Sequence, residues 1–228
     1  MKSDAAKALC SILTRPCGVI PHLAHRADQP AKLAEGVRNS RLFGERIFVL
    51  RDGKTPVNVQ GCKTGWKDPG NRYTGPEVEK LAAETGHQIG IIMPAGYFFV
   101  DIDHALLPDG TWSEKAQEIA SLFPGAYFEL SQSQTGFHIL AHAAYVPEHR
   151  QKNSKLGVEI YSKPDSRHCA LTGYGASGNI DAERAPGLML CLRAADLAIE
   201  PGTATDTTAD VWRDELSPDG DDARLKSF

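Results

Sequence analysis

The chain has 228 residues with a formal net charge of −4, and 41% of its residues are hydrophobic. This composition supports one large folded domain or two small ones, and it excludes a fibrous protein. No run of 18 apolar residues occurs, so we expect no membrane-spanning helix and a cytoplasmic location.

The first 42 residues are expected to form a helical N-terminal segment. The residue pattern favours one helix over 3–14, which Arg15-Pro16 ends, and a second over 30–43, which begins at Pro30.

Strands and helices follow one another over residues 43–199. Helices are expected from Pro76 to Gly86, from a capping box of Thr111 and Glu114 to about Phe123, and over 186–197. The Gly- and Lys-rich segment over 57–75, before the first of these helices, predicts an ordered loop. Apolar runs predict strands over 47–50, 89–93, 97–103, 126–130, 136–141, 157–161 and 167–172. Strands joined by short turns indicate an α+β domain with a mostly antiparallel or mixed sheet.

The last residues differ in composition from the rest. From Glu200 onward the chain carries eight acidic and three basic residues without apolar periodicity. We therefore expect an acidic flexible tail or linker over 200–228. The preceding residues then carry a formal net charge of +1, which is compatible with DNA binding.

Charged and polar residues interrupt three of the predicted strands. Asp101 and Asp103 share one face of their strand, and His138 and Glu159 each lie opposite to apolar neighbours. If the strands belong to one sheet, three carboxylates and an imidazole meet on one face, a set suited to Mg²⁺ or Mn²⁺. A strand that runs out into a polar turn is the alternative explanation for the two aspartates.

A Ser-rich segment precedes the histidine. Ser131, Ser133 and Thr135 supply hydroxyls, and Gly136 permits close approach of backbone to a ligand, as phosphate-binding loops require. A Ser-rich hairpin turn is the alternative.

Three motifs in series carry a resemblance to a known family. The segments FFVDIDHA, ELSQSQTGFHIL and GVEIYSKPDSRHCALTG resemble the motifs of the archaeo-eukaryotic primase superfamily, in its phage and plasmid primase-polymerase branch. The resemblance covers roughly residues 47–172. It implies a primase-polymerase catalytic domain over 43–199, with an RRM-like mixed or antiparallel catalytic sheet flanked by helices.

The resemblance also implies roles for individual residues. Asp101, Asp103 and Glu159 would hold two Mg²⁺ or Mn²⁺ ions, and His138 would contact the phosphates of the incoming nucleotide. Five further residues are expected near the same phosphates: Ser133, Gly136, Arg167, Lys54 and Lys63. The Ser-rich turn departs from the family pattern, because Gln132 and Gln134 stand where relatives often have other residues.

The activity implied is template-directed nucleotidyl transfer by a DNA primase or DNA polymerase during phage or plasmid replication in a bacterial host. The expected partners are single-stranded DNA template and primer, ribo- or deoxyribonucleoside triphosphates, and a replicative helicase domain or protein.

Other functions fit parts of the same pattern. A metal-dependent nuclease could use the same carboxylates, and a non-catalytic DNA-binding module could share the fold. Glycosyltransferases also contain D-x-D, but they leave G-x-H and V-E-I-Y unexplained. An initiator endonuclease would need a tight histidine pair, and His138 and His142 are too far apart along one strand.

Overall fold

The structure, a computed structural model, describes residues 32–199. The helix expected over 3–14 and the acidic segment 200–228 lie outside the described residues. Residues 32–198 belong to one compact unit of the chain. Two antiparallel sheets and the helices beside them confirm the α+β class. Among the described residues, no helix has the length and apolar content needed to cross a membrane.

Sheet A contains four antiparallel strands in the order β2-β1-β3-β9. Its apolar residues Phe48, Leu50 and Ile91 pack with Val37 of helix α2 and Val78 of helix α3. The α2 segment therefore belongs to the same core as sheet A. The elements are α2 (Glu35–Arg38), β1 (Phe48–Asp52), β2 (Thr55–Val57), α3 (Gly75–Thr85), β3 (Gln88–Ile92) and β9 (His168–Leu171).

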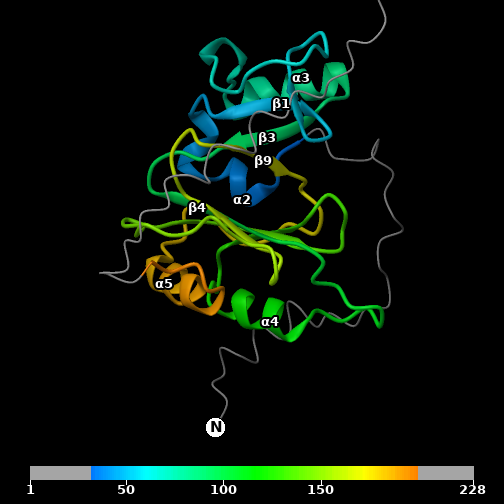
Figure 1. The fold of residues 1–228 in the computed structure, drawn as a ribbon. Coiled ribbons are helices and arrows are strands. Elements are labelled where there is room, and N and C mark those ends of the chain that lie inside the picture. Colours follow the sequence, from blue (N-terminus) through cyan, green and yellow to red (C-terminus); the bar gives the residue numbers. More distant parts are fainter. Residues whose placement is uncertain (1–31, 200–228) are drawn as a thin grey trace, which may run out of the picture. The chain divides into compact units, whose positions relative to one another are not determined.

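Sheet B contains five antiparallel strands in the order β5-β6-β4-β8-β7. Helices α4 and α5 cover one face of it, and Figure 1 shows them on the side away from sheet A. The strands are β4 (Tyr97–Ile102), β5 (Tyr127–Leu130), β6 (Phe137–His142), β7 (Lys152–Asn153) and β8 (Val158–Tyr161), and the helices are α4 (Glu114–Ser121) and α5 (Ala185–Ala194).

Strand β4 divides its side chains between two cores. Phe98, Val100 and Ile102 pack toward α4 and α5, whereas Tyr97 and Phe99 join the core that includes sheet A. This alternation follows from the two-residue period of a strand. Asp101 therefore lies on the face of sheet B that is turned toward sheet A.

Helix α3 begins and ends where local signals predict. Thr74 and Glu77 form a capping box, and Gly86 ends the helix with a left-handed φ of 73°. The helix expected over 30–43 is wrong in length. It is divided into α2 and the 3-10 helix η2 (Arg41–Gly44), because Ser40 has an extended backbone and its side chain caps η2.

Two further findings differ from the expected elements. The cap of α4 is Ser113, which accepts from the Ala116 N–H, whereas Thr111 bonds to Asp109. The loop expected over 57–75 contains the 3-10 helix η3 (Pro69–Asn71), and strand β2 ends at its first residue, Val57.

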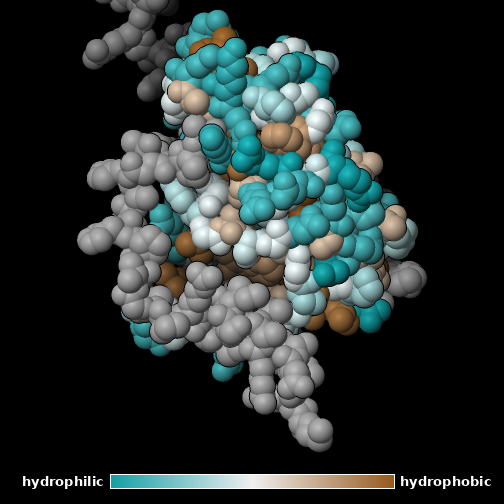
Figure 2. Space-filling model, turned by 180° about the vertical axis from the view of Figure 1, so that it is seen from behind, coloured by the Kyte–Doolittle hydropathy of each residue, from teal (hydrophilic) through white to brown (hydrophobic). Residues whose placement is uncertain are grey.

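Figure 2 shows mainly hydrophilic residues on the visible part of one side, with smaller hydrophobic areas between them. The large hydrophobic side chains that are exposed in the described part of the chain are Leu107, Tyr145, Leu156, Met189, Leu190 and Ile199.

Candidate active site

A row of charged and polar side chains crosses sheet B from edge to edge. Glu129 of β5 pairs with His138 of β6, and His138 pairs with Asp101 of β4. Asp101 pairs with Glu159 of β8, which pairs with Lys152 of β7. Directly paired residues of adjacent strands share a face. These five residues, here called the polar row, therefore lie on the face that bears Phe99.

Asp101 occupies the middle of the polar row with an unsatisfied oxygen. Its Oδ1 is buried without a hydrogen-bond partner, and its side chain is 25% exposed. Burial raises the pKa of Asp101, and the nearby charges of Asp103 and Glu159 raise it further, against a lowering by His138 and Arg167. A carboxylate in these surroundings favours a nearby cation.

The carboxylate of Glu159 already has two partners on the same face. The Lys152 ammonium lies 2.6 Å from its Oε1, and the Tyr161 hydroxyl donates to its Oε2. The hydrogen bond and the charge of Glu159 raise the pKa of Lys152. The carboxylate is thus turned toward the β7 edge, where Lys152 neutralises it.

His138 is almost fully buried and held on two sides. Its Nδ1 lies 2.8 Å from Glu129 Oε1, and its ring packs 4.7 Å from the Phe99 ring, centroid to centroid. Its other nitrogen, Nε2, faces Asp101 at 3.7 Å from Oδ1. The imidazole therefore presents Nε2 to the middle of the row.

Asp103 follows the end of β4 and is exposed. Its backbone N–H donates to the Gly157 carbonyl at 2.8 Å, and a Cβ on Gly157 would lie 2.9 Å from the Asp103 carbonyl oxygen. His104 then adopts a left-handed φ of 52°, which is uncommon outside glycine and is often found at functional sites. The turn thus begins directly after the second aspartate.

The Ser-rich loop is ordered by its own hydroxyls. Ser133 Oγ lies 3.0 Å from Ser131 Oγ and 2.8 Å from Thr135 Oγ1, and the Gly136 N–H donates to Ser131 Oγ. A Cβ on Gly136 would collide with the carbonyl oxygen of Ile102. The backbone that approaches Gly136 closely is therefore that of β4. The expected approach of Gly136 to a nucleotide stays a prediction.

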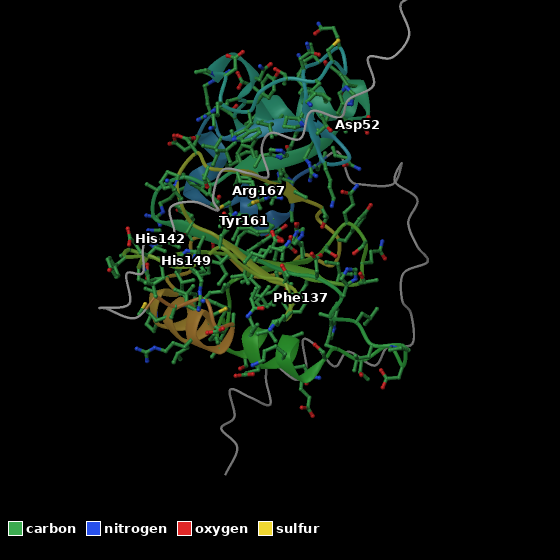
Figure 3. All side chains as sticks on the ribbon, in the orientation of Figure 1. Asp52, Phe137, His142, His149, Tyr161 and Arg167 are labelled. Carbon is green, nitrogen blue, oxygen red and sulfur yellow. The ribbon has the colours of Figure 1, made fainter. Side chains whose placement is uncertain are left out.

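Arg167 brings a positive charge to this region from the segment before β9. Its guanidinium lies 4.8 Å from the centroid of the Tyr161 ring, and Figure 3 shows the two residues close together between the sheets. The charge of Arg167 lowers the pKa of Asp101. Arg167 is thus a cation within electrostatic reach of the polar row.

Lys54 and Lys63 lie elsewhere on sheet A. Lys54 lies in the turn between β1 and β2, and Lys63 pairs through its backbone with Val57 of β2. Both are exposed. Strands β1 and β3 separate β2 from β9, and no described hydrogen bond or ion pair joins either lysine to the polar row.

The fit of a divalent ion is partial. The oxygens of Asp101, Asp103 and Glu159 are hard ligands of the kind that Mg²⁺ and Mn²⁺ prefer, and the unsatisfied oxygen of Asp101 favours a cation. Within residues 32–199, however, no three His, Cys, Asp or Glu side chains are arranged around one point as metal ligands are. Glu159 would have to leave Lys152 to complete the set.

Three residues that contribute to the site were not predicted from the sequence: Glu129, Lys152 and Tyr161. Glu129 shares the inward face of β5 with Tyr127, so the signal that marked His138 was also present there. Lys152 gave no signal because β7 has only two residues.

One pocket lies away from the polar row. A pocket of about 280 Å³ is lined by Glu35, Gly36, Asn39 and residues 176–179, and it includes no member of the polar row. Comparison with known proteins adds no family, since no family model and no curated protein matches the chain.

Proposed function

We propose that this chain catalyses template-directed nucleotidyl transfer, as the primase-polymerase catalytic domain of a DNA primase or DNA polymerase. The observation that carries the proposal is the direct pairing of Asp101 with both Glu159 and His138. Three residues from separate motifs, 21 or more positions apart in the sequence, thus become neighbours in one sheet. The resemblance of those motifs to the primase superfamily supports the same function.

The carboxylates of Asp101, Asp103 and Glu159 would hold Mg²⁺ or Mn²⁺. Bound there, the ions supply activation of the attacking 3′-hydroxyl and stabilisation of the pyrophosphate leaving group. The protein's own part is to position the reactants and to stabilise negative charge.

Basic and polar residues around the row would receive the triphosphate. Arg167 is held against Tyr161 with its charge near Asp101, so it can make charge-assisted bonds to phosphate oxygens. His138 would donate from Nε2, and Ser133 would contribute its hydroxyl. Lys54 and Lys63 would act farther out, on the DNA backbone, because both lie beside β2, at the other edge of sheet A.

The chain would work on single-stranded DNA template and primer with ribo- or deoxyribonucleoside triphosphates. We further propose a role in phage or plasmid replication in a bacterial host, beside a replicative helicase domain or protein.

A non-catalytic DNA-binding module is the second candidate. The specific observation in its favour is that Lys152 already neutralises Glu159, so this carboxylate does not require a metal ion for charge balance. The closely spaced carboxylates at Asp101 and Asp103 would then have no function.

Template-directed synthesis on single-stranded DNA tests the proposal. The assay would contain Mg²⁺ or Mn²⁺, labelled ribo- and deoxyribonucleotides, and lanes with and without a primer. Wild-type products that grow, and that Asp101→Asn and Asp103→Asn abolish, are expected. Products that shorten instead would establish a nuclease. DNA binding without synthesis by any of the proteins would favour the binding module.

A further inference from the structure

Glu129 is a buried carboxylate whose described partners are all hydrogen-bond donors. Its oxygens accept from the backbone N–H of Thr172 at 3.0 Å and of Gly173 at 2.9 Å. The Tyr127 hydroxyl donates to Oε2 at 2.8 Å. The Glu129 side chain is fully buried, so these bonds replace the water that an ionised carboxylate would otherwise need.

This arrangement determines which nitrogen of His138 carries a proton. Because Glu129 can only accept, the contact of 2.8 Å between its Oε1 and His138 Nδ1 requires a proton on Nδ1. The opposite nitrogen, Nε2, is then directed at Asp101 and the middle of the polar row. Packing against Phe99 prevents the ring from turning freely.

We infer that Glu129 is the positioning residue through which His138 becomes a phosphate-binding group. With Nδ1 held against Glu129, Nε2 is the ring nitrogen left to meet a phosphate oxygen, and a proton taken up there together with the nucleotide would make that bond charge-assisted. Glu129 fixes the direction in which Nε2 points. This role rests on the proposed function, because it assumes a nucleoside triphosphate at the row.

Glu129 also joins the two sheets at this point. Its carboxylate bonds to Thr172 and Gly173, directly after β9 of sheet A, and it lies on β5 of sheet B. The orientation of His138 therefore depends on sheet A as well as on the sheet that carries it.

A double-mutant cycle distinguishes positioning from simple structural support. The probe is dATP with Mg²⁺, and its dissociation constant is measured by calorimetry for wild type, Glu129→Gln, His138→Ala and the double variant. We expect Glu129→Gln to weaken binding about tenfold in the wild-type background and not at all in the His138→Ala background. An equal loss in both backgrounds, or no loss in either, would overturn the inference.

The matched control is a second carboxylate–histidine pair, whose histidine lies on the same strand as His138. Glu183 Oε2 lies against His142 Nδ1, at the far end of β6 and outside the polar row. Glu183→Gln should leave the dATP dissociation constant unchanged. A loss as large as that of Glu129→Gln would show that the effect is not specific to His138 and would overturn the inference.

A spectroscopic measurement on the wild-type protein keeps the inference testable if Glu129→Gln does not fold. The ¹⁵N shifts of the His138 ring should show a protonated Nδ1. A neutral ring protonated on Nε2 would contradict the inference whatever the variants do. If DNA synthesis fails but the cycle shows the expected coupling in dATP binding, the proposed function alone is contradicted. If synthesis is normal but the effects of the two substitutions on dATP binding are additive, the inference about Glu129 alone is contradicted.

Discussion

Lys152 and Glu159 face each other across β7 and β8, with Nζ 2.6 Å from Oε1. The ammonium group thus forms an ion pair with a carboxylate that the proposed function assigns to a divalent ion. Lysine and metal cannot both neutralise the same oxygen at full strength, so the two should compete.

Replacement of this lysine should therefore strengthen metal binding. For Lys152→Gln we expect Mn²⁺ to bind about threefold to tenfold more tightly, because Glu159 no longer has to break an ion pair. Titration followed by electron paramagnetic resonance measures the free ion directly. Lys115→Gln is the control, since Lys115 pairs with Glu118 on α4 at 2.7 Å. Unchanged or weaker Mn²⁺ binding by Lys152→Gln would contradict the competition.

Asp101 should be a residue at which activity and stability oppose each other. Its pKa is raised by burial and by the charges of Asp103 and Glu159, so its ionised form destabilises the fold at neutral pH. We expect Asp101→Asn to abolish synthesis and to raise the free energy of unfolding by roughly 1 kcal/mol. Urea denaturation at pH 7 measures the second effect.

The control for Asp101 is an aspartate with the opposite shift. Bonds from the Thr111 side chain and backbone lower the pKa of Asp109, so its ionised form is favoured by folding. Asp109→Asn should lower stability or leave it unchanged, without effect on synthesis. If Asp101→Asn also lowered the free energy of unfolding, the ionised Asp101 carboxylate would not be destabilising the folded protein.

Gly136 should tolerate no side chain, whether or not a nucleotide binds nearby. A Cβ there would collide with the backbone carbonyl of Ile102, which the β4–β6 ladder holds in place. Gly136→Ala should lower the free energy of unfolding by about 2–3 kcal/mol. Gly65→Ala is the matched control because no heavy atom lies within 4 Å of its added Cβ. Equal stability of the two variants in urea would refute this account.

His168 should make stability depend on pH in the acid range. Burial, with the nearby charges of Arg51 and Arg167, lowers its pKa from 6.5 to about 4, and its buried Nδ1 has no hydrogen-bond partner. Between these values the unfolded chain binds a proton that the folded protein does not. Stability is thus complete above pH 6.5 and is lost as pH falls toward 4, by at most about 1.4 kcal/mol per pH unit.

The measurement is the free energy of unfolding between pH 4 and pH 7 for wild type and His168→Asn. The variant should lose less stability on acidification, because it lacks the titrating ring. Identical slopes for the two proteins would mean that His168 titrates normally in the folded state.

Local signals predicted parts of the fold well. Thr74, Glu77 and Gly86 carry the information for α3 within a few residues, so its limits could be predicted nearly as observed. The cap of α4 could not be predicted, because Thr111 and Ser113 both precede Glu114 at positions suited to a helix cap. Contacts of Thr111 with Asp109 decided between them. The division of the helix expected over 30–43 likewise depends on Ser40, which offers a cap as readily as a helical residue.

The site was predictable only in part, for a related reason. The two-residue period of strands places Asp101, His138 and Glu159 on particular faces, and each lies in one of the three sequence motifs. The partners Glu129 and Lys152 depend on which strands become neighbours and in what register. That pairing is set by contacts between distant residues, which a single sequence does not display.

The polar row has a consequence for how the protein acquires its function during folding. Each member comes from a different strand, and a slip of one residue in any strand would turn its member toward α4 and α5. No hairpin and no misaligned sheet would then contain the complete set. The β4–β8 and β4–β6 pairings also join residues far apart in the sequence, which makes them slow to form. The proposed competence to bind a metal or nucleotide should thus arise last, as a property of the finished sheet rather than of any of its intermediates.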